Sequence, residues 1–171
     1  MRKNDDYRYY AHSDKLKAAM MILEYKDGLS MVITLPDEKD GLPKLIENLK
    51  SEDMANEFAA NMKMTNVDIT LPKFSFDYSV DLMQVLPKMG VNIEKSLSAL
   101  NPALQITGAL HKARNETHEV GTEAAAVTVI LAAGASLKPP PVPFNADHPF
   151  WFSIVDDKTG VVLFSGTLNQ L

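Results

Sequence analysis

The sequence predicts an α+β fold in which mixed or antiparallel sheets carry a few helices. Two observations favour this class. Short apolar runs bounded by Gly, Pro and Asp turn signals recur towards both ends of the chain, as they do in antiparallel sheets. Between these runs, apolar residues follow the three- and four-residue spacing of amphipathic helices. The length of 171 residues suggests a single domain.

Residues 16–25 and 29–36 are predicted to be the two strands of a hairpin. The first contains the apolar run AAMMIL, and the second reads LSMVITLP. Asp27 and Gly28 lie between them and are a turn signal.

Two helices are predicted after the charged loop PDEKDG at residues 36–41. The first spans residues 42–49, and its apolar side is formed by Leu42, Leu45, Ile46 and Leu49. Ser51 can cap the second helix, which runs to about residue 62. The residues that the second helix is expected to bury are Met54, Phe58 and Met62.

The middle of the chain is predicted to alternate between strand and helix. Residues 66–78 alternate polar and apolar side chains, as a half-buried strand does. Residues 80–89 have helical spacing, although Pro87 should distort or end that helix. Residues 93–104 are expected to be irregular and helical, and residues 106–117 to be extended.

The chain closes with FWFSIVDDKTGVVLFSGTL, which predicts two strands joined by a turn around Asp157 to Gly160. We expect these strands to pair with the strands near the N-terminus. His148, in the preceding ADHPF block, is expected to have a packing role.

Composition and charge argue against several classes of function. The chain is 46% hydrophobic and 23% charged, which is typical of globular proteins. Its net charge of -5 argues against nucleic acid or an acidic membrane surface as the partner. No run is long and apolar enough for a transmembrane helix. The absence of cysteine excludes a disulfide framework, a thiolate metal site and a cysteine nucleophile.

The sequence contains no recognisable catalytic or metal-binding constellation. The four histidines, at positions 12, 111, 118 and 148, lack the spacing of a metal site. Asp156 and Asp157 are adjacent and would face apart in an extended chain, so they cannot act as a catalytic pair. We therefore expect a protein that is not an enzyme and that uses no cofactor and no metal.

Residues 119–136, EVGTEAAAVTVILAAGAS, form a long run of small and aliphatic side chains. Val, Thr and Ile lose side-chain freedom in a helix, so the run is a poor helix former. It is also too apolar for an ordinary exposed loop, and a long apolar strand with a free edge promotes aggregation. The composition therefore fits a segment that is a loop in one state and a buried strand in another.

Four blocks of sequence carry a resemblance to a known family. They are LSMVITLPDE, VDITLPKFSFDYSVDLMQVLPKMG, HKARNETHEVGTEAAA and FNADHPFWFSIVDDKTGVVLFSGTL. Their content and order resemble the serpins, serine protease inhibitors that trap their target by a conformational change. The likeness covers nearly all of the chain but only the C-terminal half of a serpin domain. It implies a single partial serpin domain over residues 1–171, with an exposed reactive loop at about residues 119–143.

The resemblance implies that a serine protease attacks this loop as a substrate and that the cleaved loop then inserts as a new strand into the main sheet. The implied hinge consists of Glu119, Gly121, Thr122, Glu123, Ala124, Ala125 and Ala126. Family spacing from the hinge puts the reactive bond between Ala135 and Ser136, and alanine before that bond suits an elastase-like protease. The alternative bond, Leu137–Lys138, would suit a chymotrypsin-like protease.

The residues of the hinge and loop permit insertion. In an extended strand that starts at Thr122, side chains alternate between two faces. The only charge, Glu123, falls on the second face, so the first face can enter a packed core without burying a charge. That first face consists of Thr122, Ala124, Ala126, Thr128, Ile130 and Ala132.

Two departures from the family pattern affect the expected activity. The N-terminal half of a serpin domain has no counterpart here, so we expect a fragment that cannot insert its loop alone and that needs the N-terminal half as a partner. Arg114, Asn115 and Thr117 are more polar than is usual before the hinge, and unpaired polar groups in a central strand cost roughly 1–3 kcal/mol each. The alternative function is a non-inhibitory serpin-like binding or storage protein.

The expected location is extracellular, because the resemblance implies it. The N-terminal residues MRKNDDYRYY have no apolar core and do not form a signal peptide. A cytoplasmic location therefore stays open.

Overall fold

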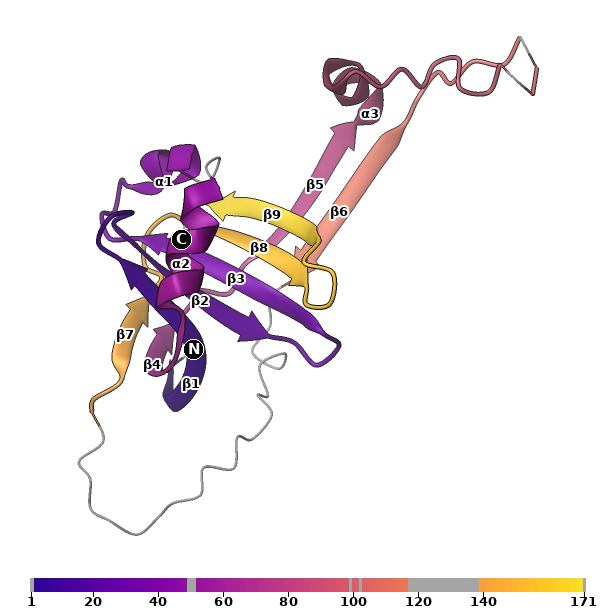
Figure 1. Ribbon diagram of the computed structural model, residues 1–171. Coiled ribbons are helices and arrows are strands. Elements are labelled where there is room, and N and C mark those ends of the chain that lie inside the picture. The colour runs from indigo at the N-terminus through magenta and orange to yellow at the C-terminus, as the bar shows by residue number, and fades with distance from the viewer. Residues whose placement is uncertain (1, 49–51, 99, 102, 117–138, 171) are drawn as a thin grey trace. The chain divides into compact units, whose positions relative to one another are not determined.

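The computed structural model describes residues 2–48, 52–98, 100–101, 103–116 and 139–170 of the chain (Figure 1). The chain divides into two units. The first comprises Met1–Pro72 and Glu119–Leu171, and the second comprises Lys73–His118.

A seven-stranded sheet forms the first unit, with its strands in the order β7-β4-β1-β2-β3-β8-β9 (Figure 1). The strands are β1 Arg2–Ser13, β2 Ala18–Glu24, β3 Leu29–Pro36, β4 Lys63–Thr70, β7 Val142–Asn145, β8 Phe150–Asp156 and β9 Val162–Leu168. In this sheet the described neighbours are antiparallel, except that β4 and β7 are parallel. A mixed sheet accompanied by a few helices confirms the predicted α+β class.

The predicted N-terminal hairpin is present as β2 and β3. Gly28 in its turn has a φ of 74°, which costs glycine little, and the Tyr25 N–H donates to the Leu29 carbonyl oxygen at 2.7 Å. On its other side β3 pairs with β8, where Ile33 lies opposite Phe152. The expected pairing between N-terminal and C-terminal strands is therefore confirmed.

Two parts of the strand prediction were wrong. Residues 2–13 form β1, which the sequence did not predict because charged residues and Asn obscure the alternation at its start. Residues 66–78 are not one strand, because β4 ends at Thr70 and β5 (Ser75–Asp81) belongs to the other sheet. Pro72 lies between them and lacks the N–H that a sheet ladder needs, so the strand cannot continue through it.

Helices α1 (Leu42–Asn48) and α2 (Glu52–Asn61) confirm the two predicted helices. Burial of a side chain as large as that of Phe58 stabilises by about 1.5–3 kcal/mol, so it fastens α2 to the sheet. The buried cluster between the helices and the sheet consists of Ala11, Ala18, Leu42, Leu45 and Phe58. Met62 and Ile46 pack against this cluster, whereas Leu49, Ser51 and the Met54 side chain lie outside the described residues.

The face of the sheet opposite α1 and α2 holds most of the remaining apolar core. Gly166 of β9 lies beside the Phe152 ring on this face, and a Cβ at Gly166 would come within 3.1 Å of two ring atoms. The absence of a side chain at Gly166 therefore leaves space for the Phe152 ring. The largest buried side chains on this face are Met21, Met31, Ile33, Val67, Phe144, Phe150 and Phe152.

The second unit is built on an antiparallel ribbon of β5 and β6 (Leu110–Glu116). After β5 come α3 (Leu82–Val85) and the 3-10 helix η1 (Leu86–Met89), which has Pro87 in its first turn. Pro87 thus ends the α-helical part of this segment, as the sequence predicts.

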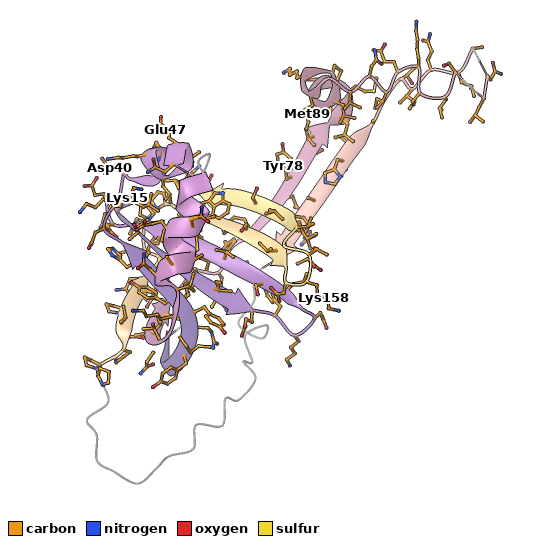
Figure 2. The ribbon with its side chains drawn as sticks, in the orientation of Figure 1. Lys15, Asp40, Glu47, Tyr78, Met89 and Lys158 are labelled. Carbon is orange, nitrogen blue, oxygen red and sulfur yellow. The ribbon has the colours of Figure 1, made fainter. Side chains whose placement is uncertain are left out.

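The rest of the second unit is less regular than predicted. The described residues within 93–104 form turns rather than a helical region, and the regular strand begins at Leu110 rather than at Ile106. Figure 2 shows the side chains of Tyr78 and Met89 standing out from this unit, and both are exposed. Among the helices of the described residues, none has the length and apolar character required to cross a membrane.

Candidate functional site

The predicted reactive segment lies mostly outside the described residues. This applies to the hinge residues Glu119, Gly121, Thr122, Glu123, Ala124, Ala125 and Ala126, to the bond Ala135–Ser136 and to the alternative bond Leu137–Lys138. The structure describes the strand on each side of the segment. β6 ends at Glu116 before it, and β7 begins at Val142 after it.

β7 anchors the C-terminal side of the predicted loop. It runs parallel to β4, with Phe144 opposite Ile69. Phe144 is 1% exposed, and just beyond β7 the Ala146 N–H donates to the Thr70 carbonyl oxygen at 2.9 Å. The last residues of the loop predicted at 119–143 therefore belong to a strand that is held by the sheet and by a buried ring.

His148 lies three residues beyond β7 and connects it to the end of β3. Its Nε2 lies 2.6 Å from the Pro36 carbonyl oxygen, and its Nδ1 lies 2.7 Å from Asp147 Oδ1. The hydrogen bond with His148 is the main reason that the pKa of Asp147 is lowered from its ordinary value of 3.8. Asp147 is therefore a carboxylate at neutral pH.

β6 anchors the N-terminal side of the predicted loop and carries a polar face. Lys112 lies opposite Ser79, and Arg114 lies opposite Asp77. The Arg114 Nε is 3.7 Å from Asp77 Oδ1, and both side chains are mostly exposed. Arg114 therefore has an ionic partner within this ribbon, while the expectation that polar residues before the hinge weaken the main sheet of a full serpin domain stays a prediction. An exposed ion pair of this kind contributes about 0–1 kcal/mol and leaves no buried charge unpaired.

The other two polar residues of the expected departure remain undescribed. The Asn115 side chain and all of Thr117 lie outside the described residues. Asp77, the partner of Arg114, was missed because it is 37 positions away in sequence, and only the β5–β6 register makes the two residues neighbours.

β6 also has an edge that can accept another strand. Within the described part of the chain, β6 pairs with β5 alone. The backbone N–H and C=O groups along the edge of a strand are able to pair with an added strand. Among the described residues, one edge of β6 therefore has no strand beside it. Across the described residues, no group of three His, Asp or Glu side chains gathers as metal ligands.

A family model described as Serpin (serine protease inhibitor) matches residues 1–171. The chain belongs to the serpin family. The β5–β6 ribbon, the β2–β3 hairpin and the β8–β9 hairpin are thus parts of a serpin fold, and the resemblance predicted from the four sequence blocks is confirmed.

Known serpins match this chain over almost its whole length. It is 37% identical over 170 residues to Serpin B3 of Homo sapiens, and the alignment covers 95% of the chain but 44% of the human protein. The structure of Serpin48 from the insect Tenebrio molitor matches with a TM-score of 0.75 and 30% identity, covering 100% of the chain and 45% of that protein. The structure of thyroxine-binding globulin in complex with thyroxine matches with a TM-score of 0.76 and 26% identity, and the match covers 98% of the chain and 45% of that protein. The chain therefore spans slightly less than half the length of these relatives.

Proposed function

We propose that this chain supplies the reactive-loop half of a serpin that inhibits a serine protease by suicide-substrate loop insertion. The observation that carries the proposal is the family match over residues 1–171, combined with the small, uncharged inward face of the strand that starts at Thr122. In this mechanism the protease cleaves the loop as a substrate, and the loop then becomes a strand of the sheet before the acyl-enzyme is hydrolysed.

The available edge of β6 supports insertion from one side. An inserted strand needs hydrogen-bonding partners along both of its edges, or it becomes an exposed edge itself. β6 can supply one partner, and the chain spans 44–45% of its compared relatives. The second partner strand would come from the N-terminal half of a serpin domain. The 171-residue chain by itself is then a substrate that is cleaved without trapping the protease.

We propose Ala135–Ser136 as the reactive bond. Alanine at this position fits the shallow specificity pocket of an elastase-like protease. The alternative, Leu137–Lys138, fits the hydrophobic pocket of a chymotrypsin-like protease. Mass spectrometry of the cleaved chain separates these bonds, because each gives a C-terminal fragment of different mass.

The test is to incubate the chain with pancreatic elastase and to separate the products on a denaturing gel. The chain alone should yield two fragments cut after Ala135 and no covalent complex. Addition of an N-terminal serpin half, or use of a full-length form that contains this sequence, should yield a complex that survives denaturation. An uncut chain would overturn the assignment of the loop, and a cut without a complex in the full-length form would overturn the insertion mechanism.

Two charge substitutions in that full-length form test the inserting face directly. Thr122→Arg puts a charge where an inward side chain must be buried, so it should convert the inhibitor into a substrate. Glu123→Arg is the matched control, because its neighbouring position faces outward and should leave inhibition intact. If both variants inhibit equally, the assigned faces are wrong.

The second candidate function is that of a non-inhibitory serpin-like binding or storage protein. Thyroxine-binding globulin, whose structure this chain resembles, binds thyroxine. The polar residues before the hinge favour this candidate, since Arg114, Asn115 and Thr117 are more polar than the pattern expected there. Thr122→Arg separates the two functions, because a non-inhibitory serpin has no inhibition to lose.

The proposed location is extracellular, as the family resemblance implies, with the cytoplasm as the alternative. Fractionation of cells that express a tagged full-length form decides between them. Recovery of the protein only from the cytosol would overturn the extracellular proposal.

A further inference from the structure

Two histidines from distant parts of the chain contact adjacent residues at the start of the loop between β3 and α1. His148, beyond β7, reaches the Pro36 carbonyl oxygen with Nε2 at 2.6 Å. His12, in β1, approaches Asp37 Oδ1 with Nε2 at 3.0 Å. The start of this loop is therefore held on two sides by imidazole groups.

The contacts of His148 require a proton on both ring nitrogens. The Pro36 carbonyl oxygen can only accept a hydrogen bond, so Nε2 must donate. Nδ1 lies 2.7 Å from an oxygen of Asp147, and an ionised carboxylate also can only accept. A neutral imidazole has a single N–H, so only the imidazolium form makes both bonds. The His148 side chain is 10% exposed, which leaves little access for water to replace a lost bond.

The contacts of His12 require only one proton. Its Nε2 can donate to the Asp37 carboxylate in either charge state, and its Nδ1 is 3.6 Å from Asp14 Oδ1. The His12 side chain is 37% exposed, so water can satisfy Nδ1 when the ring is neutral. The two histidines therefore differ in how their contacts respond to pH, although they hold neighbouring residues.

The other charged groups in this region act on the carboxylates. Lys39 of the loop lies where its charge favours ionised Asp147. Tyr10 of β1 has its pKa raised by burial and secondarily by the charge of Asp37, so it stays neutral over the relevant pH range. Figure 2 shows Asp40 of the same loop and Lys15 of the β1–β2 turn, and both are exposed to solvent.

We propose that His148 is a proton-dependent latch that ties the segment following β7 to the end of β3. An ordinary histidine loses its second proton at about pH 6.5. When His148 loses the proton on Nδ1, Nε2–H can still donate to Pro36, but Nδ1 and the Asp147 oxygen face each other as two acceptors, and their repulsion weakens the latch. The charged form of His148 is the form that makes both hydrogen bonds. Their stabilisation of the fold is therefore complete at mildly acidic pH and is lost as the pH rises. The contacts of His148 are part of the fold and do not depend on the proposed function. Only an effect of these contacts on the reactive loop would rest on that function.

The decisive variant is Asp147→Asn. The asparagine amide can donate to Nδ1 of a neutral ring, while Nε2–H still donates to Pro36, so both bonds of His148 survive without the second proton. His12→Gln is the matched control on the same loop, because glutamine can still donate to Asp37. The experiment measures the thermal unfolding midpoint of the wild-type chain and of each variant between about pH 5.5 and 8.5, which brackets the ordinary histidine value.

The wild-type midpoint should fall by about 1–4 °C as the pH rises, the shift expected when an ion pair to a mostly exposed carboxylate is lost in a chain of this length. Asp147→Asn should remove most of that fall and keep a high midpoint at the alkaline end, and His12→Gln should keep the fall. Equal pH dependence in the wild type and Asp147→Asn would overturn the proposal. A fall that disappears only in His12→Gln would also overturn it, because His12 would then be the sensor.

Nitrogen NMR of the chain labelled in its histidines provides a second test that does not depend on melting. At pH 6 the wild-type His148 ring should have the spectrum of an imidazolium, with both nitrogens protonated. At the same pH the neutral ring, with its proton on Nε2, should be more populated in Asp147→Asn than in the wild type. A neutral His148 ring in the wild type at pH 6 would overturn the latch.

Discussion

Replacement of Thr34 with valine should stabilise the chain, because it removes a buried hydroxyl group that lacks a hydrogen bond. Thr34 in β3 is 0% exposed and lies opposite Met20 and Trp151. Within the described residues, its Oγ1 has no hydrogen-bond partner. Such a hydroxyl costs about 1–3 kcal/mol. With some loss for imperfect packing of the new methyl group, the expected gain is about 1 kcal/mol.

Urea denaturation followed through the fluorescence of Trp151, the single tryptophan of the chain, measures this gain. The midpoint should rise at unchanged slope, and the melting temperature should rise by about 2–4 °C. Thr65→Val is the matched control, because the Thr65 hydroxyl donates to the Lys63 carbonyl oxygen at 3.1 Å and its loss should cost up to about 1 kcal/mol. If Thr34→Val lowers the midpoint as much as Thr65→Val does, the Thr34 hydroxyl is satisfied and the reasoning fails.

Three further predictions concern other parts of the first unit. Phe58→Ala should leave a void between α2 and the sheet and cost about 3–5 kcal/mol in urea denaturation, and a loss below about 1 kcal/mol would contradict the packing described for Phe58. Lys17 has a φ of 51°, a conformation that is costly for a residue with a side chain, so Lys17→Gly should stabilise by up to about 1 kcal/mol. Glycine at Lys15 in the same turn should not stabilise, and equal effects at both positions would refute the argument from φ. The pKa of Asp156 is lowered from its ordinary value of 3.8, chiefly by the hydrogen bond from the Thr159 hydroxyl. Its stabilisation is therefore present above that value and lost as the pH falls through the lowered pKa, so Asp156→Asn should make the free energy of unfolding depend less on pH in the acidic range.

Most of the first unit could be predicted from the sequence because its elements have clear periodicity or turn signals. The β2–β3 hairpin has an apolar run on each side of Asp27-Gly28, and α1 has apolar residues at helical spacing. β1 was missed because its alternation is visible only once Tyr9 and Ala11 are known to share a face of the sheet with residues of β2. The break between β4 and β5 is signalled by Pro72, but an alternating pattern over residues 66–78 outweighed that signal.

The predicted site depended less on local pattern than on the family resemblance. The sequence predicts which face of the segment after Thr122 could be buried, since alternation in a strand is fixed by geometry. It could not predict the environment of Arg114, because that depends on the register that brings Asp77 opposite. The contacts of His148 with Pro36 were equally inaccessible, because they join parts of the chain 112 positions apart.

Residues 71–141 leave the first sheet at the end of β4 and return to it at the start of β7. Because β4 and β7 pair in parallel, the two strands that flank this segment are neighbours in the sheet. Asn145 lies opposite Thr70, and the Ala146 N–H donates to the Thr70 carbonyl oxygen. A cut within that segment would sever the chain covalently without releasing its C-terminal piece. That piece would keep its place through the β3–β8 and β4–β7 ladders and the buried rings of Phe144 and Phe150. A nicked molecule should therefore migrate as one species on a native gel and as two on a denaturing gel.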